Sequence, residues 1–175
     1  MPVATELPVD TNATAEDMAN EMFGDGIEIV SASYTGNTAA SGVFSDGNAS
    51  APGISPSDTG VILSTGNAAS ITNSSGDANV SSGTTTNHGL AGDSDLDALS
   101  GQTTFDAAIF EATFVPEGST LTLQVVFSSE EYLEYVNSGF NDAVGVWVNG
   151  QPAELQVGSG NISINDINDQ TNQNL

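Results

Sequence analysis

No lysine or arginine occurs among the 175 residues of this chain, whereas aspartate and glutamate together number 23. Every internal Lys or Arg ion pair is therefore excluded, and only water, backbone N–H groups or cations can offset the carboxylates. A net charge of −23 destabilises a compact body through self-repulsion. Bound divalent cations relieve this repulsion directly, because each offsets two charges and gains oxygen ligands. The alternative is an acidic surface that binds no specific ion.

The same composition excludes several partners and chemistries. A chain whose only histidine, His88, is its only potentially cationic side chain cannot neutralise phosphates, so no nucleic acid is expected as a partner. No apolar run is long enough for direct membrane insertion. The absence of cysteine excludes disulfides, thiolate metal sites and cysteine nucleophiles. The first ten residues, MPVATELPVD, do not form a classical signal peptide.

The hydrophobic pattern predicts an all-β fold, an antiparallel β-sandwich of jelly-roll type with one short N-terminal helix and long polar loops. We expect residues 1–13 to be irregular and residues 14–175 to form a single domain. The helix should begin at Thr14, because Asp17 follows it three residues later as in a capping box. Gly24 and Gly26 should end it.

Short apolar runs then predict the strands, with the clearest pair at 107–115 and 120–128, separated by the turn residues 116–119. Further strands are expected at 27–34, 42–44, 60–64, 143–149 and 161–165. Residues 66–104 are small and polar and predict a long loop region. No closing strand follows residue 165, so we expect a domain incomplete at its C-terminus. Self-association, a neighbouring chain or a further segment would complete it.

The segment 128–142 carries the densest group of acidic and amide side chains after a strong strand. Its candidate metal ligands are Glu130, Glu131, Asn141 and Asp142. Glu130 and Glu131 are adjacent and point to opposite faces of an extended backbone, so one of them faces inward. Without Lys or Arg, an inward carboxylate needs backbone donors or a cation, and hard oxygen ligands suit Ca²⁺. A solvated acidic loop is the alternative.

A second acidic cluster lies at Asp93, Asp95 and Asp97, whose alternation is typical of a loop that wraps a cation with every second side chain. It lacks the glycine and glutamate positions of an EF-hand loop. A third cluster, at residues 165–169, is equally well explained by turn chemistry.

Catalysis has little support in the sequence, and we expect a protein that is not an enzyme. His88 lies in a Gly/Thr/Asn-rich stretch, and no G-x-S-x-G nucleophile motif is present. A glycoside hydrolase that uses Glu130 or Glu131 stays open, because paired carboxylates can perform that chemistry. A calcium-dependent carbohydrate-binding module is the other alternative, although one tryptophan offers little stacking surface for sugars.

Three segments resemble a known family: GVILSTGNAAS at 60–70, SSEEYLEYVNSGFND at 128–142 and NISINDIN at 161–168. Together with the run from 92 to 150 they resemble the choice-of-anchor L domain. The resemblance implies a secreted or surface-attached bacterial β-sandwich without an established enzyme activity, whose pattern continues past residue 175. We therefore expect an extracellular, calcium-stabilised structural or adhesive module of a surface, matrix or filament, exported without a classical signal peptide.

Overall fold

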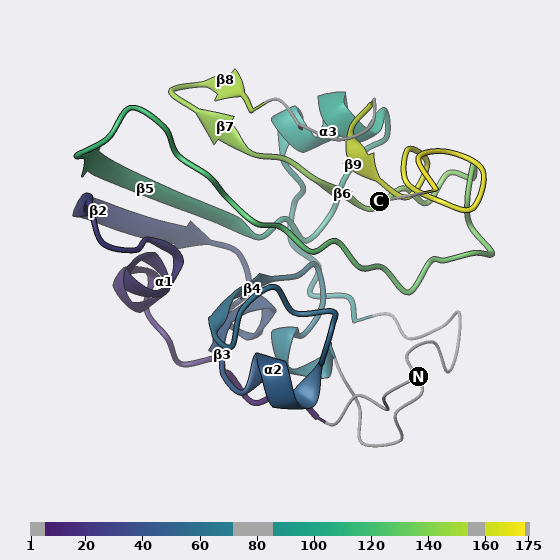
Figure 1. The fold of residues 1–175 in the computed structure, drawn as a ribbon. Coiled ribbons are helices and arrows are strands. Elements are labelled where there is room, and N and C mark those ends of the chain that lie inside the picture. The colour runs from purple at the N-terminus through teal and green to yellow at the C-terminus, as the bar shows by residue number, and fades with distance from the viewer. Residues whose placement is uncertain (1–5, 72–85, 154–159, 174–175) are drawn as a thin grey trace. The chain divides into compact units, whose positions relative to one another are not determined.

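Figure 1 shows the computed structural model, which describes residues 6–71, 86–153 and 160–173. These residues form two compact units. The first contains the described residues up to 71 together with 86–90 and 106–126, and the second contains 91–105, 127–153 and 160–173. Several small antiparallel sheets and few helices make up the units, which confirms the all-β class. The face-to-face sandwich stays a prediction.

The longest regular feature of the first unit is an antiparallel ladder between β2 (Ile27–Thr35) and β5 (Ile109–Pro116). The pairing extends over the full length of both strands, with one irregularity between Ile29 and Ser31. Half-buried and exposed residues alternate along most of each strand, because successive side chains point to opposite faces of the ladder. The predicted strands at 27–34 and 107–115 are therefore confirmed.

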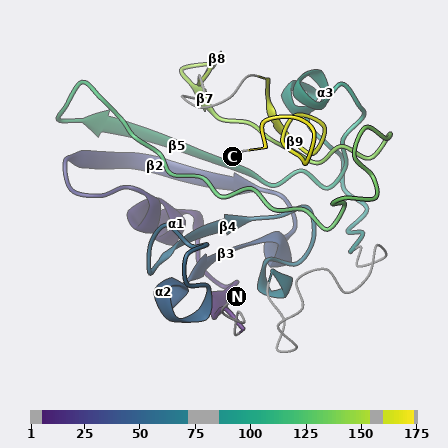
Figure 2. The same ribbon diagram turned by 45° about the vertical axis from the view of Figure 1, so that its right-hand side comes forward.

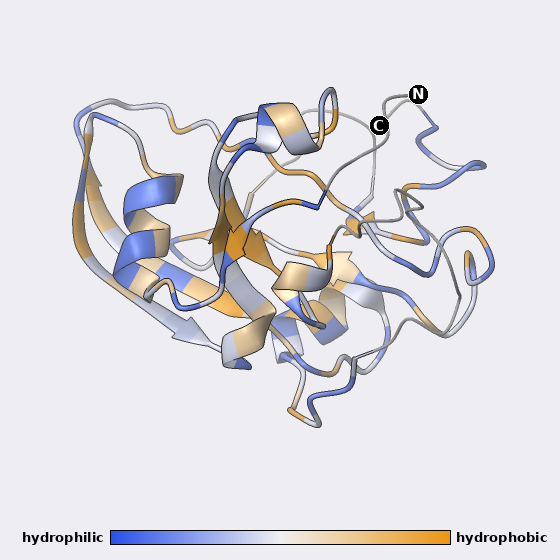
Figure 3. Ribbon diagram, turned by 90° about the horizontal axis from the view of Figure 1, so that it is seen from below, coloured by the Kyte–Doolittle hydropathy of each residue, from blue (hydrophilic) through white to orange (hydrophobic). Residues whose placement is uncertain are grey.

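Helix α1 (Ala15–Met22) begins where the sequence predicts. The hydroxyl oxygen of Thr14 accepts a hydrogen bond from the N–H of Asp17 at 3.1 Å, and the Asp17 carboxylate accepts one from the N–H of Thr14 at 2.9 Å. This capping box satisfies N–H groups that have no partner inside the helix. The helix packs against β2 and buries Met18 and Ala19, while much of its length is hydrophilic (Figure 3).

A three-stranded sheet supplies the core of the first unit. Its order is β1-β3-β4, with both pairings antiparallel. The strands are β1 (Val9–Asp10), β3 (Ser41–Phe44) and β4 (Gly60–Leu63), and the short helices around them are η1 (Thr38–Ala40), α2 (Gly47–Ser50) and η2 (Ala68–Ser70). Leu7, Phe44, Ile62 and Ala68 form the buried cluster. Residues 9–10 were expected to be irregular, and this expectation is wrong because they pair with β3.

The second unit contains one helix and two short ladders. Helix α3 (Ser94–Ser100) packs against β6 (Ala143–Val144), which pairs with β9 (Ile162–Ser163); β7 (Trp147–Val148) pairs with β8 (Gln151–Pro152). The β7–β8 hairpin turns through Asn149 and Gly150, which both have positive φ values, of 52° and 72°. Asn-Gly favours this turn because both residues tolerate a left-handed backbone. Ser163 and Ile164 are fully buried.

Two predictions of local structure are wrong. The polar stretch 66–104 was expected to be loop throughout, but residues 94–100 form α3; residues 72–85 of that stretch lie outside the described part. Residues 120–128 were expected to pair as a strand, but they turn back after β5 and join no sheet (Figures 1 and 2). Apolar alternation favours an extended backbone, but a strand also requires a neighbour in register.

Candidate metal-binding site

Ser129 connects the start of the acidic segment to its end within the second unit. Its hydroxyl donates a hydrogen bond to a carboxylate oxygen of Asp142 at 2.7 Å, and its oxygen accepts one from the N–H of Glu131 at 3.1 Å. One serine therefore holds the backbone of Glu131 and the side chain of Asp142 together. Two of the predicted ligands are thus brought close to each other by a residue that sequence reasoning did not select.

Glu131 is the carboxylate with the least favourable surroundings in this segment. The residue as a whole is half-buried, but its Oε2 atom is shielded from solvent and has no hydrogen-bond partner. Burial, followed by the negative charges of Asp142, Glu130 and Glu134, raises the pKa of Glu131 above its ordinary value of 4.5. A carboxylate in these surroundings favours either a proton or a cation, because the chain has no Lys or Arg to pair with it.

Two pairs of aromatic side chains pack at this turn. The hydroxyl of Tyr132 donates to the carbonyl oxygen of Ile167, and its ring meets that of Phe127 edge-on with centroids 6.3 Å apart. Tyr135 and Phe140 form a second edge-on pair at 5.1 Å. Burial, and then the charge of Asp142, raises the pKa of Tyr132. Residues 129–132 (SEEY) therefore place a carboxylate with unfavourable electrostatics, Glu131, next to an aromatic residue, Tyr132, that is held by packing and a hydrogen bond.

The side chain of Asn141 acts as a clamp: both its NH₂ group and its oxygen are used in hydrogen bonds to other segments. Its amide NH₂ donates to the carbonyl oxygen of Ser100 at 2.8 Å, and its amide oxygen accepts from the N–H of Asn165 at 3.0 Å. The side-chain oxygen of Asn165 in turn accepts from the N–H of Asn137 at 2.6 Å. Asn141 therefore joins the end of α3, the acidic segment and the segment after β9.

The cluster at 93–97 does not have the loop geometry that its alternation suggested. Asp93 caps α3: its side chain accepts from the N–H groups of Asp95 at 2.9 Å and Leu96 at 3.3 Å. Asp97, in the first turn, accepts from both the N–H and the hydroxyl of Thr104, each at 2.6 Å. These two bonds lower the pKa of Asp97 below its ordinary value. The loop geometry expected for this cluster is wrong, because residues 94–100 are helical, whereas cation binding by Asp93, Asp95 and Asp97 stays a prediction.

The described structure thus gathers Glu131 and Asp142, with Glu130 and Glu134 near enough to act on the Glu131 pKa, and uses Asp93, Asp97 and Asn141 for local hydrogen bonds. Across residues 6–71, 86–153 and 160–173, no three or more His, Asp or Glu side chains are arranged to hold a metal ion. A metal at this position would therefore have two protein carboxylates as its main charged ligands. The predicted ligand set stays a prediction.

Sequence reasoning missed the amide side chains that organise the C-terminal segment. Asn168 is buried; its NH₂ donates to the carbonyl oxygens of Ile164 and Asn165, and its oxygen accepts from two backbone N–H groups. The NH₂ of Asn161 donates to the carbonyl oxygen of Leu99 at 2.8 Å. The recurring Asn and Asp of this segment are a signal for such side-chain-to-backbone turns, but not for their distant partners.

Asp106 is a further residue that sequence reasoning did not select. It is 8% exposed, with a φ of 51°, and its carboxylate accepts from the N–H groups of His88 at 2.9 Å and Leu90 at 2.6 Å. The sequence predicts His88 to be a loop residue, and the structure places it in an irregular segment with its Nε2 shielded and without a partner. Asp106 therefore anchors this segment within the first unit.

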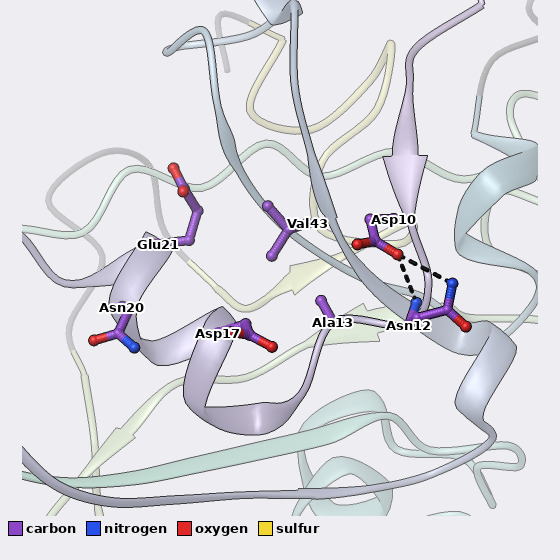
Figure 4. Close-up of a pocket in the computed structure, with 7 residues that line it drawn as sticks. All are labelled: Asp10, Asn12, Ala13, Asp17, Asn20, Glu21 and Val43. Atoms are coloured by element: carbon purple, nitrogen blue, oxygen red, sulfur yellow. Dashed lines mark hydrogen bonds between the residues drawn. The ribbon is translucent and has the colours of Figure 1, made fainter.

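A shallow cavity of about 450 Å³ lies beside α1 in the first unit (Figure 4). It is lined by Asp10, Asn12, Ala13, Asp17, Asn20, Glu21 and Val43. The carboxylate of Asp10 accepts from the N–H of Asn12 at 2.9 Å, and Asp17 belongs to the capping box. Asp10 and Asp17 therefore have local structural roles. None of the predicted metal ligands lines this cavity.

Comparison with known proteins gives one finding. The family model of the choice-of-anchor L domain matches residues 7–175, and comparisons with curated proteins and with solved structures find no match. No helix in the described residues has the length and apolarity needed to cross a membrane. Choice-of-anchor domains indicate a cell-surface or extracellular protein. Because the match covers essentially the whole chain, including the SEEY motif and the Asn clamp around it, the chain belongs to the choice-of-anchor L domain family.

Proposed function

We propose that this chain is an extracellular structural or adhesive module of a bacterial surface, matrix or filament, and that calcium stabilises it at Glu131 and Asp142. The observation that carries the calcium proposal is the shielded Oε2 of Glu131, which has no hydrogen-bond partner and lies near the charge of Asp142. A cation between these two carboxylates would turn their repulsion into attraction.

Calcium suits this position better than other common cations. The available donors are carboxylate, hydroxyl and backbone oxygens, which are hard ligands, and the chain has no cysteine for a softer metal. Two carboxylates give a weaker site than the three or four of an intracellular calcium sensor. We therefore expect a dissociation constant on the order of 10⁻⁴–10⁻³ M, the range of extracellular calcium modules.

The overall charge supports the same assignment. A chain of net charge −23 that is active outside the cell is exposed to millimolar divalent cations, which screen and bind its carboxylates. Family membership supports the extracellular location. The structural or adhesive role rests on this location together with a rigid hydrogen-bonded acidic segment whose aromatic residues pack against one another.

The test is the thermal unfolding of the wild-type protein and two variants in EDTA, in CaCl₂ and in MgCl₂. We expect calcium to raise the Tm of the wild type and of Glu28→Gln, a matched loss of one exposed carboxylate in β2, but not of Glu131→Gln. Magnesium at equal ionic strength should act more weakly, because it demands a stricter octahedral geometry. An equal Tm in EDTA and calcium for the wild type would refute a structural calcium site.

One observation favours a second candidate, a glycoside hydrolase. Glycoside hydrolases use as general acid a carboxyl group whose pKa is raised by its surroundings. Burial, and then the charge of Asp142, raises the pKa of Glu131 in this way. The Glu131→Gln variant separates the candidates, because a hydrolase would lose glycoside turnover while keeping its fold. Turnover of polysaccharide substrates by the wild type, abolished in this variant, would support the hydrolase.

A further inference from the structure

Residues 120–126 of the first unit have the side chains of a strand but no strand partner among the residues that the structure describes. The sequence TLTLQVV consists of residues that favour β-structure, with apolar side chains at alternate positions over most of its length. No hydrogen bond joins this backbone to any other described residue, and the segment lies in no sheet. Figure 1 shows it running back, opposite in direction to β5.

The apolar residues of the segment are exposed to solvent. Leu121, Leu123, Val125 and Val126 are 46%, 45%, 43% and 50% exposed. Four exposed apolar side chains within six residues form a local apolar patch, and such patches mark interaction sites. The backbone N–H and C=O groups, which no other described residue pairs with, add a template for a further strand.

We propose that residues 120–126 are an acceptor for β-strand addition by a basic, strand-forming segment of a partner polypeptide. In this mode the main-chain hydrogen bonds supply affinity, and alternate side chains supply specificity. The proposal deepens the adhesive part of the proposed function and rests on it, but does not depend on the calcium site.

Charge decides which partner fits. The chain contains 23 carboxylates and no Lys or Arg, so the first unit offers only negative charges to an incoming strand. Glu117 lies three residues before the segment, and Glu28 and Glu111 are exposed on the ladder of β2 and β5 in the same unit. A second copy of this chain would bring a further charge of −23 to the contact, whereas a strand with Lys or Arg at its ends is attracted.

The test uses the full chain and synthetic nine-residue peptides of alternating valine and threonine, extended by two lysines or two glutamates at each end. We expect the lysine peptide to bind at least about tenfold more tightly than the glutamate peptide at low ionic strength, and to weaken as salt is added. N-methylation of alternate residues along one edge of the lysine peptide should abolish binding, and methylation along the other edge should not, because only one edge pairs with the acceptor.

Two variants test whether the lysine peptide binds to residues 120–126. Leu121→Thr combined with Leu123→Thr should reduce binding several-fold, whereas Ile54→Thr, a loss of an apolar side chain that is 64% exposed elsewhere in the same unit, should not. Both variants change exposed residues, so both are expected to fold, and circular dichroism checks this. Glu131→Gln should bind the lysine peptide like the wild type, which separates this proposal from the calcium proposal.

Three outcomes would overturn the proposal: no binding of the lysine peptide, equal binding of the two peptides, or equal effects of methylation on both edges. Analytical ultracentrifugation of the chain without peptide tests whether the chain associates with itself. A dimer at low ionic strength that the Leu121→Thr and Leu123→Thr pair disrupts would assign the segment to a second copy of the chain, and would also overturn the proposal.

Discussion

The carboxylate of Asp97 accepts two hydrogen bonds from one residue, Thr104: its N–H and its hydroxyl each lie 2.6 Å from the same oxygen. The two residues lie on either side of the end of α3, so this contact fixes the chain as it leaves the helix. Asp93 caps the other end of the helix. Acidic residues that suggested a cation loop therefore stabilise a short helix that has no basic residue in its last turn.

The first prediction is that Asp97→Asn lowers the Tm by the same amount in EDTA and in calcium. The substitution replaces an ionised acceptor by a neutral one, and bonds to ionised acceptors are the stronger ones. The measurement is differential scanning fluorimetry of the variant and of Asp95→Asn, which removes the same charge from the same turn at a side chain that bonds to no other described residue. If calcium no longer raised the Tm of Asp97→Asn, calcium would instead bind at the cluster of Asp93, Asp95 and Asp97.

The second prediction is that Glu131→Gln raises stability in EDTA but removes the gain that calcium gives. Its raised pKa means that folding opposes ionisation of this carboxyl group, so the neutral glutamine relieves a cost present at pH 7. At a calcium concentration ten times the dissociation constant, the wild type should gain about 1.4 kcal/mol and the variant nothing. Urea unfolding with and without calcium measures both effects. A variant that is less stable than the wild type in EDTA would contradict the assignment.

Local patterns predicted the parts of the fold that depend on local contacts. The capping box of Thr14 and Asp17 spans three residues, and the ladder of β2 and β5 follows the alternation of its own side chains. The sequence also pointed to Glu131 and Asp142, because an acidic run without Lys or Arg leaves few ways to neutralise an inward carboxylate. The structure brings these two residues close together, since Ser129 bonds both to the side chain of Asp142 and to the N–H of Glu131.

The remaining features depend on partners that are distant in sequence. Asn161 bonds to the carbonyl of Leu99, 62 positions away, and no spacing rule indicates such a pair. Asp93 and Asp97 are compatible with either a loop or a helix start, and the bond from Thr104 stabilises the helical form. Residues 120–126 have strand propensity, but propensity does not supply the neighbour that a ladder requires.

The third prediction is that Asn141→Ala destabilises the second unit by about 1–3 kcal/mol, because it leaves the carbonyl of Ser100 and the N–H of Asn165 without partners. Asn141→Asp keeps an acceptor for Asn165 but loses the donor and adds a charge next to Asp142, so it should also destabilise in EDTA. Urea unfolding measures both, with the exposed Asn20→Ala in α1 as control. A cost for Asn141→Ala that exists only in calcium would make Asn141 a ligand rather than a clamp.

The fourth prediction concerns Asp106, whose carboxylate holds the N–H groups of His88 and Leu90. Asp106→Ala leaves both donors unsatisfied and should cost about 2–4 kcal/mol. Hydrogen exchange should show faster exchange at the amides of residues 88 and 90. Asp58→Ala, which removes a single exposed bond to the N–H of Asn48, should cost less than 1 kcal/mol, about the value of one net hydrogen bond. Unchanged exchange in Asp106→Ala would show that the anchor does not act on this segment.

The last prediction is a pH dependence at the capping box of α1. The hydroxyl of Thr14, followed by its N–H, lowers the pKa of Asp17 below 3.8, so folding favours the ionised carboxylate. The stability it contributes is present above pH 3.8 and is lost as the pH falls through the lowered folded-state pKa. Acid also relieves the repulsion among the other carboxylates, so the measured quantity is the difference in Tm between the wild type and Asp17→Asn. This difference should be constant from pH 5 to pH 7 and should shrink below about pH 4.

Glu21→Gln, outside the capping box on the same helix, is the matched control for the loss of one charge. A difference that grows on acidification would mean that the protonated form of Asp17 is the one the fold prefers.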